Sequence, residues 1–194
     1  QVFLFPIELK HPIKCQQGNR VWERSHHHEN IQFALDLHSL PSDAPAKILA
    51  ASDGIAYIYD QCKSPNPDGH AHNDDPCGEG YGKHIRIMHT DDSLTIYAHL
   101  SQIMVKQLET VKRGQVIGIE GLSGRAGTRH LHFGVHRPNL NYLQEILKNP
   151  GWTGLSVPFK MTIRYSDRSE SEIISSDQIR WDDTFNPPYL FGVK

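Results

Sequence analysis

The chain has 194 residues, enough for one domain with a full hydrophobic core or for such a domain with an appendage. A net charge of −2 and an isoelectric point near 6.7 exclude a strongly basic nucleic-acid-binding protein, and no apolar run approaches the ~20 residues of a transmembrane helix. The chain begins at Gln1 with no signal-peptide pattern, which favours a mature or trimmed product.

The first 45 residues carry two predicted strands and one candidate metal ligand. Residues 3–7 are apolar, and because Pro6 and Pro12 break any helix here, they predict a short strand. Residues 31–37, IQFALDL, alternate so that four apolar side chains share one face of a second strand and Asp36 lies on the other. A carboxylate on the open face of a buried strand is a candidate ligand; an ordinary exposed Asp is the alternative.

Short strands follow at close spacing through the middle of the chain. Residues 83–89 and 94–100 predict a hairpin whose second strand carries Thr95, Tyr97 and His99 on one face. The other predicted elements here are two strands in residues 46–59 joined at Asp53-Gly54, a short helical turn at 101–108 and a strand at 116–120.

The C-terminal part is predicted to contain the one convincing helix, at residues 141–148. Strands are predicted at 157–165 and 172–174, and the last residues are expected to pack back on the surface. The density of short strands predicts an all-β fold of mainly antiparallel sheet, with an open sandwich or barrel-like groove and one short C-terminal helix. Three parts are expected: residues 1–24 as an N-terminal strand and connector, 25–136 as the core, and 137–194 as an extension packed on it.

The three cysteines predict one disulfide. Cys62 and Cys77 flank a polar loop rich in Pro, Gly and Asp, and a bond between them would close a loop of about 15 residues and imply an oxidising compartment. Three free thiols are the alternative, and Cys15 has no predicted role. The loop contains a candidate cation site, for which a solvated loop is the alternative: Asp68, His70, His72, Asp74 and Asp75.

Histidines are numerous and clustered in this sequence. There are thirteen, and His130 and His132 in the segment HLHF share one face of a predicted strand, with Leu131 and Phe133 on the other. Paired imidazoles backed by an apolar face suit a metal site. A surface strand that carries two histidines is the alternative. Neither an HExxH nor a GxSxG motif is present, which excludes the common zinc-protease and serine-hydrolase signatures.

The order of several motifs from residue 25 to residue 136 resembles the lysostaphin/LytM-type zinc metallopeptidases, which cut peptide bonds in bacterial cell-wall peptidoglycan. Linked motifs in family order are more specific than any one of them. They are SH at 25–26 with FALDL at 33–37, APAKILAASDGIA at 44–56, YGKHIRIMH at 81–89, TIYAHL at 95–100, VKRGQVIG at 111–118 and GTRHLHF at 127–133.

The resemblance implies a zinc ion held by a first histidine, by Asp36 and by His132, with a zinc-bound water as nucleophile. His99 and His130 would flank that water, one as general base and the other stabilising the charged intermediate. The spacing before Asp36 departs from the compact family form, so the first ligand is chosen from His26, His27 and His28; His26 is favoured because Ser25-His26 matches the longer variant. His38 is expected to support Asp36.

The resemblance further implies a secreted or periplasmic protein of the bacterial cell envelope that acts on peptidoglycan peptides, and we expect a monomer. Two alternatives remain open. One is a catalytically inactive family member that binds cell wall or a partner protein and regulates other hydrolases. The other is a general metal-binding or carbohydrate-binding β-domain, which explains the histidines but not the order of the motifs.

Overall fold

The structure of the chain is a computed structural model. The described residues are 1–18, 26, 28, 30–41, 45–63, 74–139, 144, 148–149, 151, 153–164 and 169–186.

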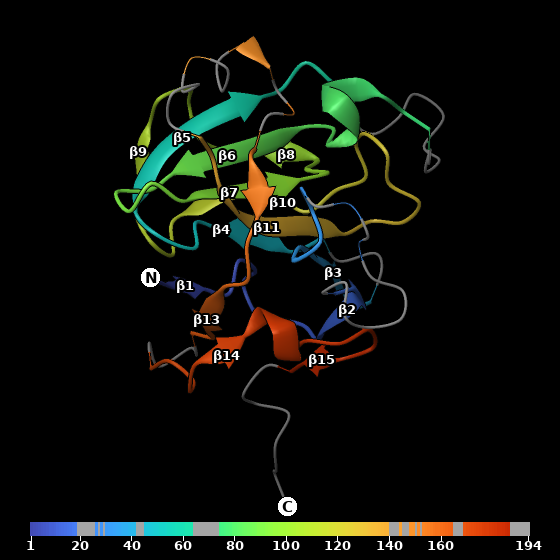
Figure 1. Ribbon diagram of the computed structural model, residues 1–194. Coiled ribbons are helices and arrows are strands. Elements are labelled where there is room, and N and C mark those ends of the chain that lie inside the picture. The colour runs from blue at the N-terminus through green and yellow to red at the C-terminus, as the bar shows by residue number, and fades with distance from the viewer. Residues whose placement is uncertain are drawn as a thin grey trace, which may run out of the picture.

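A nine-stranded antiparallel sheet forms the centre of the molecule (Figure 1). Its strands come from almost the full length of the chain, so that segments distant in sequence pair directly. In spatial order they are β15 (Thr184–Phe185), β2 (Ile13–Gln17), β3 (Leu35–Ser39), β11 (Leu131–Arg137), β7 (Leu94–Ala98), β6 (His84–Met88), β5 (Gly54–Tyr59) and β9 (Thr110–Val111), with β12 (Leu155–Ser156) paired to β11.

Two three-stranded sheets pack with the main sheet. One is antiparallel and contains β4 (Lys47–Leu49), β10 (Val116–Ile119) and β8 (Gln102–Ile103). The other joins the two ends of the chain and contains β1 (Val2–Leu4), β13 (Lys160–Thr162) and β14 (Ile174–Ser175). In this second sheet β1 runs parallel to β13, and Figure 1 shows it below the main sheet. Within the described residues, the short 3-10 helices are η1 (Cys77–Gly80) and η3 (Ser176–Gln178).

The hydrophobic core lies against one face of the main sheet. Leu131, Phe133 and Val135 alternate along β11 and are almost fully buried in the core, and the Phe133 ring contacts those of Tyr97 and Phe159. Each such apolar side chain contributes about 1.5–3 kcal/mol on burial. Because the side chains of a strand alternate, the other face of β11 is left to His132 and His136.

The predicted all-β class and the antiparallel hairpin of β6 and β7 are confirmed. Both strands expected in residues 46–59 exist, as β4 and β5, but they belong to different sheets. The strand β2, not predicted, lies in the main sheet beside β3. The expected division into three parts stays a prediction.

Two predicted boundaries are wrong for identifiable reasons. The strand expected from residue 31 begins at Leu35, because residues 31–33 form a turn in which the Ala34 N–H donates to the Ile31 carbonyl. Residues 101–108 form no helical turn, because residues 102–103 form β8. Its pairing with β10 supplies inter-strand hydrogen bonds that a helix at this place could not make. The C-terminal strands are also shorter than expected.

The predicted C-terminal helix falls largely outside the described residues, although Gln144 and Lys148 within it have helical backbone. The predicted disulfide between Cys62 and Cys77 is confirmed, and Cys15 is a free, buried thiol. No helix in the described part of the chain is long and apolar enough to cross a membrane.

Candidate metal centre

Three buried side chains converge at the edge of the pair β3–β11. Asp36 of β3 pairs directly with His132 of β11, and His132 Nδ1 lies 2.9 Å from Asp36 Oδ1. His26, which precedes β3 in the chain, places its Nε2 3.3 Å from the same oxygen. One potential ligand atom from each side chain lies within 4.8 Å of the other two. His26, Asp36 and His132 are called the metal cluster below.

The electrostatics of the metal cluster keep Asp36 ionised. Burial of this carboxyl acts to raise its pKa, but the neighbouring His130 and His26 outweigh it and hold the pKa of Asp36 well below its ordinary value. Asp36 in turn raises the pKa of His26 against the opposing effect of burial. Burial lowers the pKa of His132, which therefore offers a neutral imidazole.

The donor set of the metal cluster fits a zinc ion. Two imidazole nitrogens and one carboxylate oxygen are the ligands that catalytic zinc commonly takes from a protein. The Nε2 of His132 is buried and has no hydrogen-bond partner among the described residues. The ligand atom of this ring would be the other nitrogen, Nδ1, which like His26 Nε2 can give up its proton and bind a cation.

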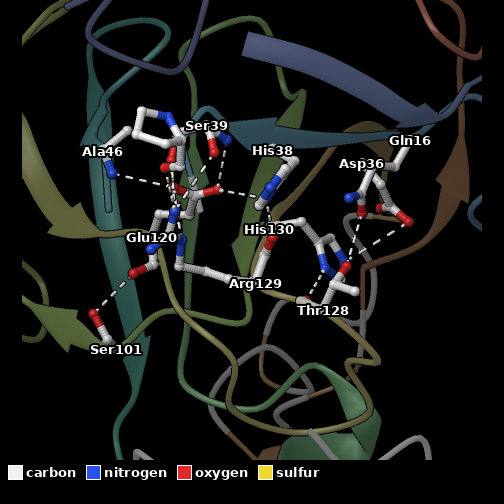
Figure 2. A network of polar contacts seen from close by, with 11 residues as sticks. Gln16, Asp36, His38, Ser39, Ala46, Ser101, Glu120, Thr128, Arg129 and His130 are labelled. Atoms are coloured by element: carbon white, nitrogen blue, oxygen red, sulfur yellow. Dashed lines mark hydrogen bonds and ion pairs between the residues drawn. The ribbon is translucent and has the colours of Figure 1, made fainter. Parts of the chain in front are cut away.

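Two further histidines lie beside the metal cluster. The ring centroids of His99 and His130 are 4.6 Å apart, and His130 Nε2 lies 3.7 Å from Asp36 Oδ2. His99 Nδ1 is 2.9 Å from the Ser123 carbonyl, and His130 Nδ1 is 2.8 Å from that of Thr128, a contact that Figure 2 shows. A carbonyl only accepts hydrogen bonds, so each Nδ1 carries the proton and each Nε2 is left as a base.

His99 is held in an uncommon backbone conformation. Its φ is 62°, in the left-handed region that non-glycine residues seldom adopt, and its N–H donates to the Tyr81 carbonyl over 2.9 Å. Such backbone concentrates at functional sites. Burial, followed by the neighbouring His130 and His132, lowers the pKa of His99 well below its ordinary value. The ring is therefore neutral near pH 7.

A groove of about 1000 Å³ runs past these histidines. Its walls include Glu79, Tyr81 and Arg125. The segments of Tyr81 and Arg125 approach so closely that glycine is required: a Cβ on Gly82 would lie 2.2 Å from the Ser123 carbonyl oxygen, and one on Gly124 would lie 2.3 Å from the Gly82 nitrogen.

The structure brings together the site residues expected from the sequence. His26, Asp36, His99, His130 and His132 all line this groove. His28, the rival first ligand, also lines it but is exposed and outside the metal cluster, whereas His27 lies outside the described residues. Positions 68, 70 and 72 of the candidate cation loop are also outside the described residues; Asp75 accepts a hydrogen bond from the Cys77 N–H.

The sequence did not reveal the place of Tyr81 in the groove, and the expected contact of His38 is replaced by another. Tyr81 lies with its ring centroid 5.6 Å from that of His132, and burial raises its pKa. Tyr81 belongs to the motif YGKHIRIMH at 81–89, but nothing in the sequence predicted that its ring would lie beside that of His132. His38 was expected to support Asp36; instead its Nδ1–H donates to the Arg129 carbonyl.

The family model that matches this sequence is described as Peptidase family M23, and it covers residues 39–144, more than half of the chain. Peptidoglycan DD-endopeptidase ShyA of Vibrio cholerae is 44% identical over 52 residues, which are 27% of this chain and 12% of the relative. Murein hydrolase activator NlpD of Escherichia coli is 46% identical over 54 residues, 28% of this chain and 14% of that protein. The matches thus span about an eighth of each relative's length.

Two solved structures share the fold at low sequence identity. The M23 metalloprotease pseudoalterin has a TM-score of 0.51 and 13% identity, covering 91% of this chain and 95% of that one. A point mutant of the catalytic domain of the prophage-encoded M23 protein EnpA from Enterococcus faecalis has a TM-score of 0.50 and 20% identity, covering 79% of this chain and 93% of that one.

Proposed function

Because this chain belongs to peptidase family M23, we propose that it is a zinc-dependent endopeptidase that hydrolyses peptide bonds in bacterial peptidoglycan, in stem-peptide cross-links or cross-bridges. The observation that carries the proposal is the convergence of His26, Asp36 and His132 beside His99 and His130 in one groove. The match to a peptidoglycan DD-endopeptidase supports the substrate class.

The metal cluster would hold the zinc through His26 Nε2, an Asp36 carboxylate oxygen and His132 Nδ1. Bound zinc supplies a Lewis acid that polarises the scissile carbonyl and lowers the pKa of a water toward ~7. Asp36 contributes the negative charge of the ligand set, and the direct pairing of β3 with β11 fixes its distance from His132.

His99 and His130 would handle the protons of the reaction. Each presents a basic Nε2 toward the groove because its Nδ1–H is committed to a backbone carbonyl. One of the two would take a proton from the attacking water. The other, when its Nε2 carries a proton, would donate a hydrogen bond to the substrate oxygen on which negative charge develops. We favour His99 as the base, because burial keeps its imidazole neutral and ready to accept a proton near pH 7.

A second candidate function is regulatory. The chain is as similar to a murein hydrolase activator as to the DD-endopeptidase, so a protein that binds cell wall or a partner and stimulates another hydrolase is the alternative. The intact donor set and the two flanking histidines favour the enzyme. We also propose an extracytoplasmic location, since the disulfide suits an oxidising compartment.

The proposal is tested by incubating the purified, zinc-loaded chain with purified peptidoglycan and analysing the soluble products by mass spectrometry. We expect new peptide ends, abolished by a chelator and restored by zinc. A zinc-loaded protein that releases nothing alone, yet increases release by an added peptidoglycan hydrolase, would establish the regulatory function instead.

A further inference from the structure

A second polar group of residues lies behind the two flanking histidines. Glu120, directly after β10, is completely buried. Its carboxylate accepts hydrogen bonds from the Ser39 N–H over 3.0 Å, from the Ala46 N–H over 3.1 Å and from the Ser39 hydroxyl. Figure 2 shows these contacts converging on one side chain. Ser39, Ala46, Glu120 and Arg129, with His38, are called the Glu120 network below.

Arg129 balances the buried charge of Glu120. Its Nε lies 3.4 Å from Glu120 Oε2, and its Nη2 donates to the Ser39 hydroxyl over 3.2 Å and to the Pro41 carbonyl over 3.3 Å. Its side chain is only 15% exposed. The guanidinium therefore has several partners at once, which fixes Arg129 more firmly than a surface ion pair would.

The Glu120 network is joined to His130 through the backbone. Arg129 immediately precedes His130, and its own carbonyl accepts a hydrogen bond from His38 Nδ1–H. The residue before Arg129 is Thr128, whose carbonyl orients the His130 ring over 2.8 Å. The N–H of His130 donates to the carbonyl of Gly121, the residue after Glu120, over 3.2 Å.

The same network is joined to His99. The Ser101 hydroxyl donates to the Glu120 carbonyl over 2.9 Å, and Ser101 is two residues after His99. A Cβ on Gly121 would lie 2.2 Å from the Ser101 nitrogen and 2.7 Å from the His99 carbonyl oxygen. The segment that carries Glu120 therefore packs directly between the backbone of His99 and that of His130.

We propose that Glu120 is a positioning residue that, through Arg129, sets the orientation of the His130 ring relative to His99 and Asp36. Glu120 does not line the groove and touches none of the three metal-cluster side chains in the described structure. It acts by anchoring Arg129, and with it the Thr128 carbonyl that holds His130 Nδ1–H. The role in hydrolysis rests on the proposed function; the effect on the His130 ring does not.

The test compares Glu120→Gln with a matched control, Glu170→Gln. Glu170 also pairs with an arginine, Arg113, but lies in the C-terminal part, outside the groove and the Glu120 network. In zinc-loaded protein, we expect Glu120→Gln to lower kcat about 10–100-fold with KM changed little, the size seen when groups that support a zinc site are removed. Glu170→Gln should leave both constants unchanged.

A readout independent of activity is the ¹⁵N signals of the His130 ring. Wild type should show one tautomer with the proton on Nδ1, and Glu120→Gln a mixture, at unchanged zinc content. If Glu120→Gln fails to fold, Arg129→Ala and Arg129→Lys replace it, and lysine should recover part of the kcat and of the Nδ1–H tautomer that alanine loses. Folded variants with wild-type kcat and wild-type His130 signals would overturn the proposal. An inactive wild type would refute the proposed function while the ring signals still decided the positioning role.

Discussion

The two buried polar groups beside the strand pair β3–β11, the Glu120 network and the metal cluster, differ in the partners of their carboxylates. In the Glu120 network, the carboxylate meets two backbone N–H groups, a hydroxyl and a guanidinium, all fixed in place. In the metal cluster, Asp36 Oδ1 faces His26 Nε2 and His132 Nδ1, and a second nitrogen of His132 has no partner among the described residues.

This difference distinguishes a buried carboxylate with a structural role from one that could bind a metal ion. A buried carboxylate with fixed donors on every side is stabilised where it is, and nothing further needs to bind. In the metal cluster the groups that face Asp36 are imidazole nitrogens, which can give up their protons and bind a cation, whereas backbone N–H groups and a guanidinium cannot. The chemical kind of group that faces the carboxylate, rather than burial or charge, therefore distinguishes the proposed metal site from the Glu120 network.

The largest expected effect on zinc binding and on cleavage comes from replacing His26, the first histidine of the metal cluster. Because His26 is buried against Asp36 whereas His28 is exposed in the groove, we expect His26→Ala to lose zinc and all measurable peptidoglycan cleavage, and His28→Ala to keep both. Elemental analysis and product release on the two variants check this. Zinc lost from His28→Ala alone would move the first ligand to position 28.

Replacement of His99 should separate catalysis from metal binding. His99→Asn removes the proposed base but no ligand, so we expect zinc to stay bound while kcat falls about 10²–10⁴-fold, the usual contribution of a general base. Zinc titration and steady-state kinetics on the same preparation measure both. Loss of zinc in step with activity would make His99 part of the metal cluster.

The disulfide should affect stability more than chemistry. The bond between Cys62 and Cys77 closes a 15-residue separation, so Cys62→Ser with Cys77→Ser should lower the free energy of unfolding by about 3 kcal/mol. Urea denaturation measures this, and the double variant should still bind zinc because neither cysteine belongs to the metal cluster. A reductant should destabilise wild type alone; equal effects on both proteins would contradict the assignment.

His136 offers a test of whether a buried histidine nitrogen without a hydrogen-bond partner is by itself enough to indicate a zinc ligand. It is fully buried on the same face as His132, its Nε2 lacks a hydrogen-bond partner among the described residues, and burial lowers its pKa to about 3. The unfolded chain takes up a proton on this ring below about pH 6.5 and the folded chain does not, so stability falls as the pH falls from about 6.5 toward 3.

We therefore expect His136→Asn to keep zinc and to weaken the pH dependence of unfolding by up to about 1.4 kcal/mol per pH unit between pH 6 and 4. Chemical denaturation at several pH values measures the slope. The surface variant His11→Asn controls for the removal of a histidine. An unchanged slope in His136→Asn would show that this ring is already protonated in the folded protein.

Local patterns predicted much of the fold and the proposed site. Alternation around His132 and in β7 was visible because it follows from the geometry of a strand, and the motif order pointed to Asp36, His99 and His130 together. The sequence could not predict that residues 31–33 turn before β3, since Ile31 and Phe33 keep the alternation of a strand there. Nor could it predict the Glu120 network, because two segments distant in sequence, residues 39–46 and 120–129, meet at that one carboxylate.

The most direct test of the central claim is the zinc content of the purified chain, measured by elemental analysis for wild type, Asp36→Ala, His132→Ala and the network variant Glu120→Gln. We predict about one zinc per chain in wild type and in Glu120→Gln, and none in the other two. Wild type that binds no zinc at saturating concentration, or Asp36→Ala and His132→Ala variants that retain it, would contradict the assignment of the metal cluster.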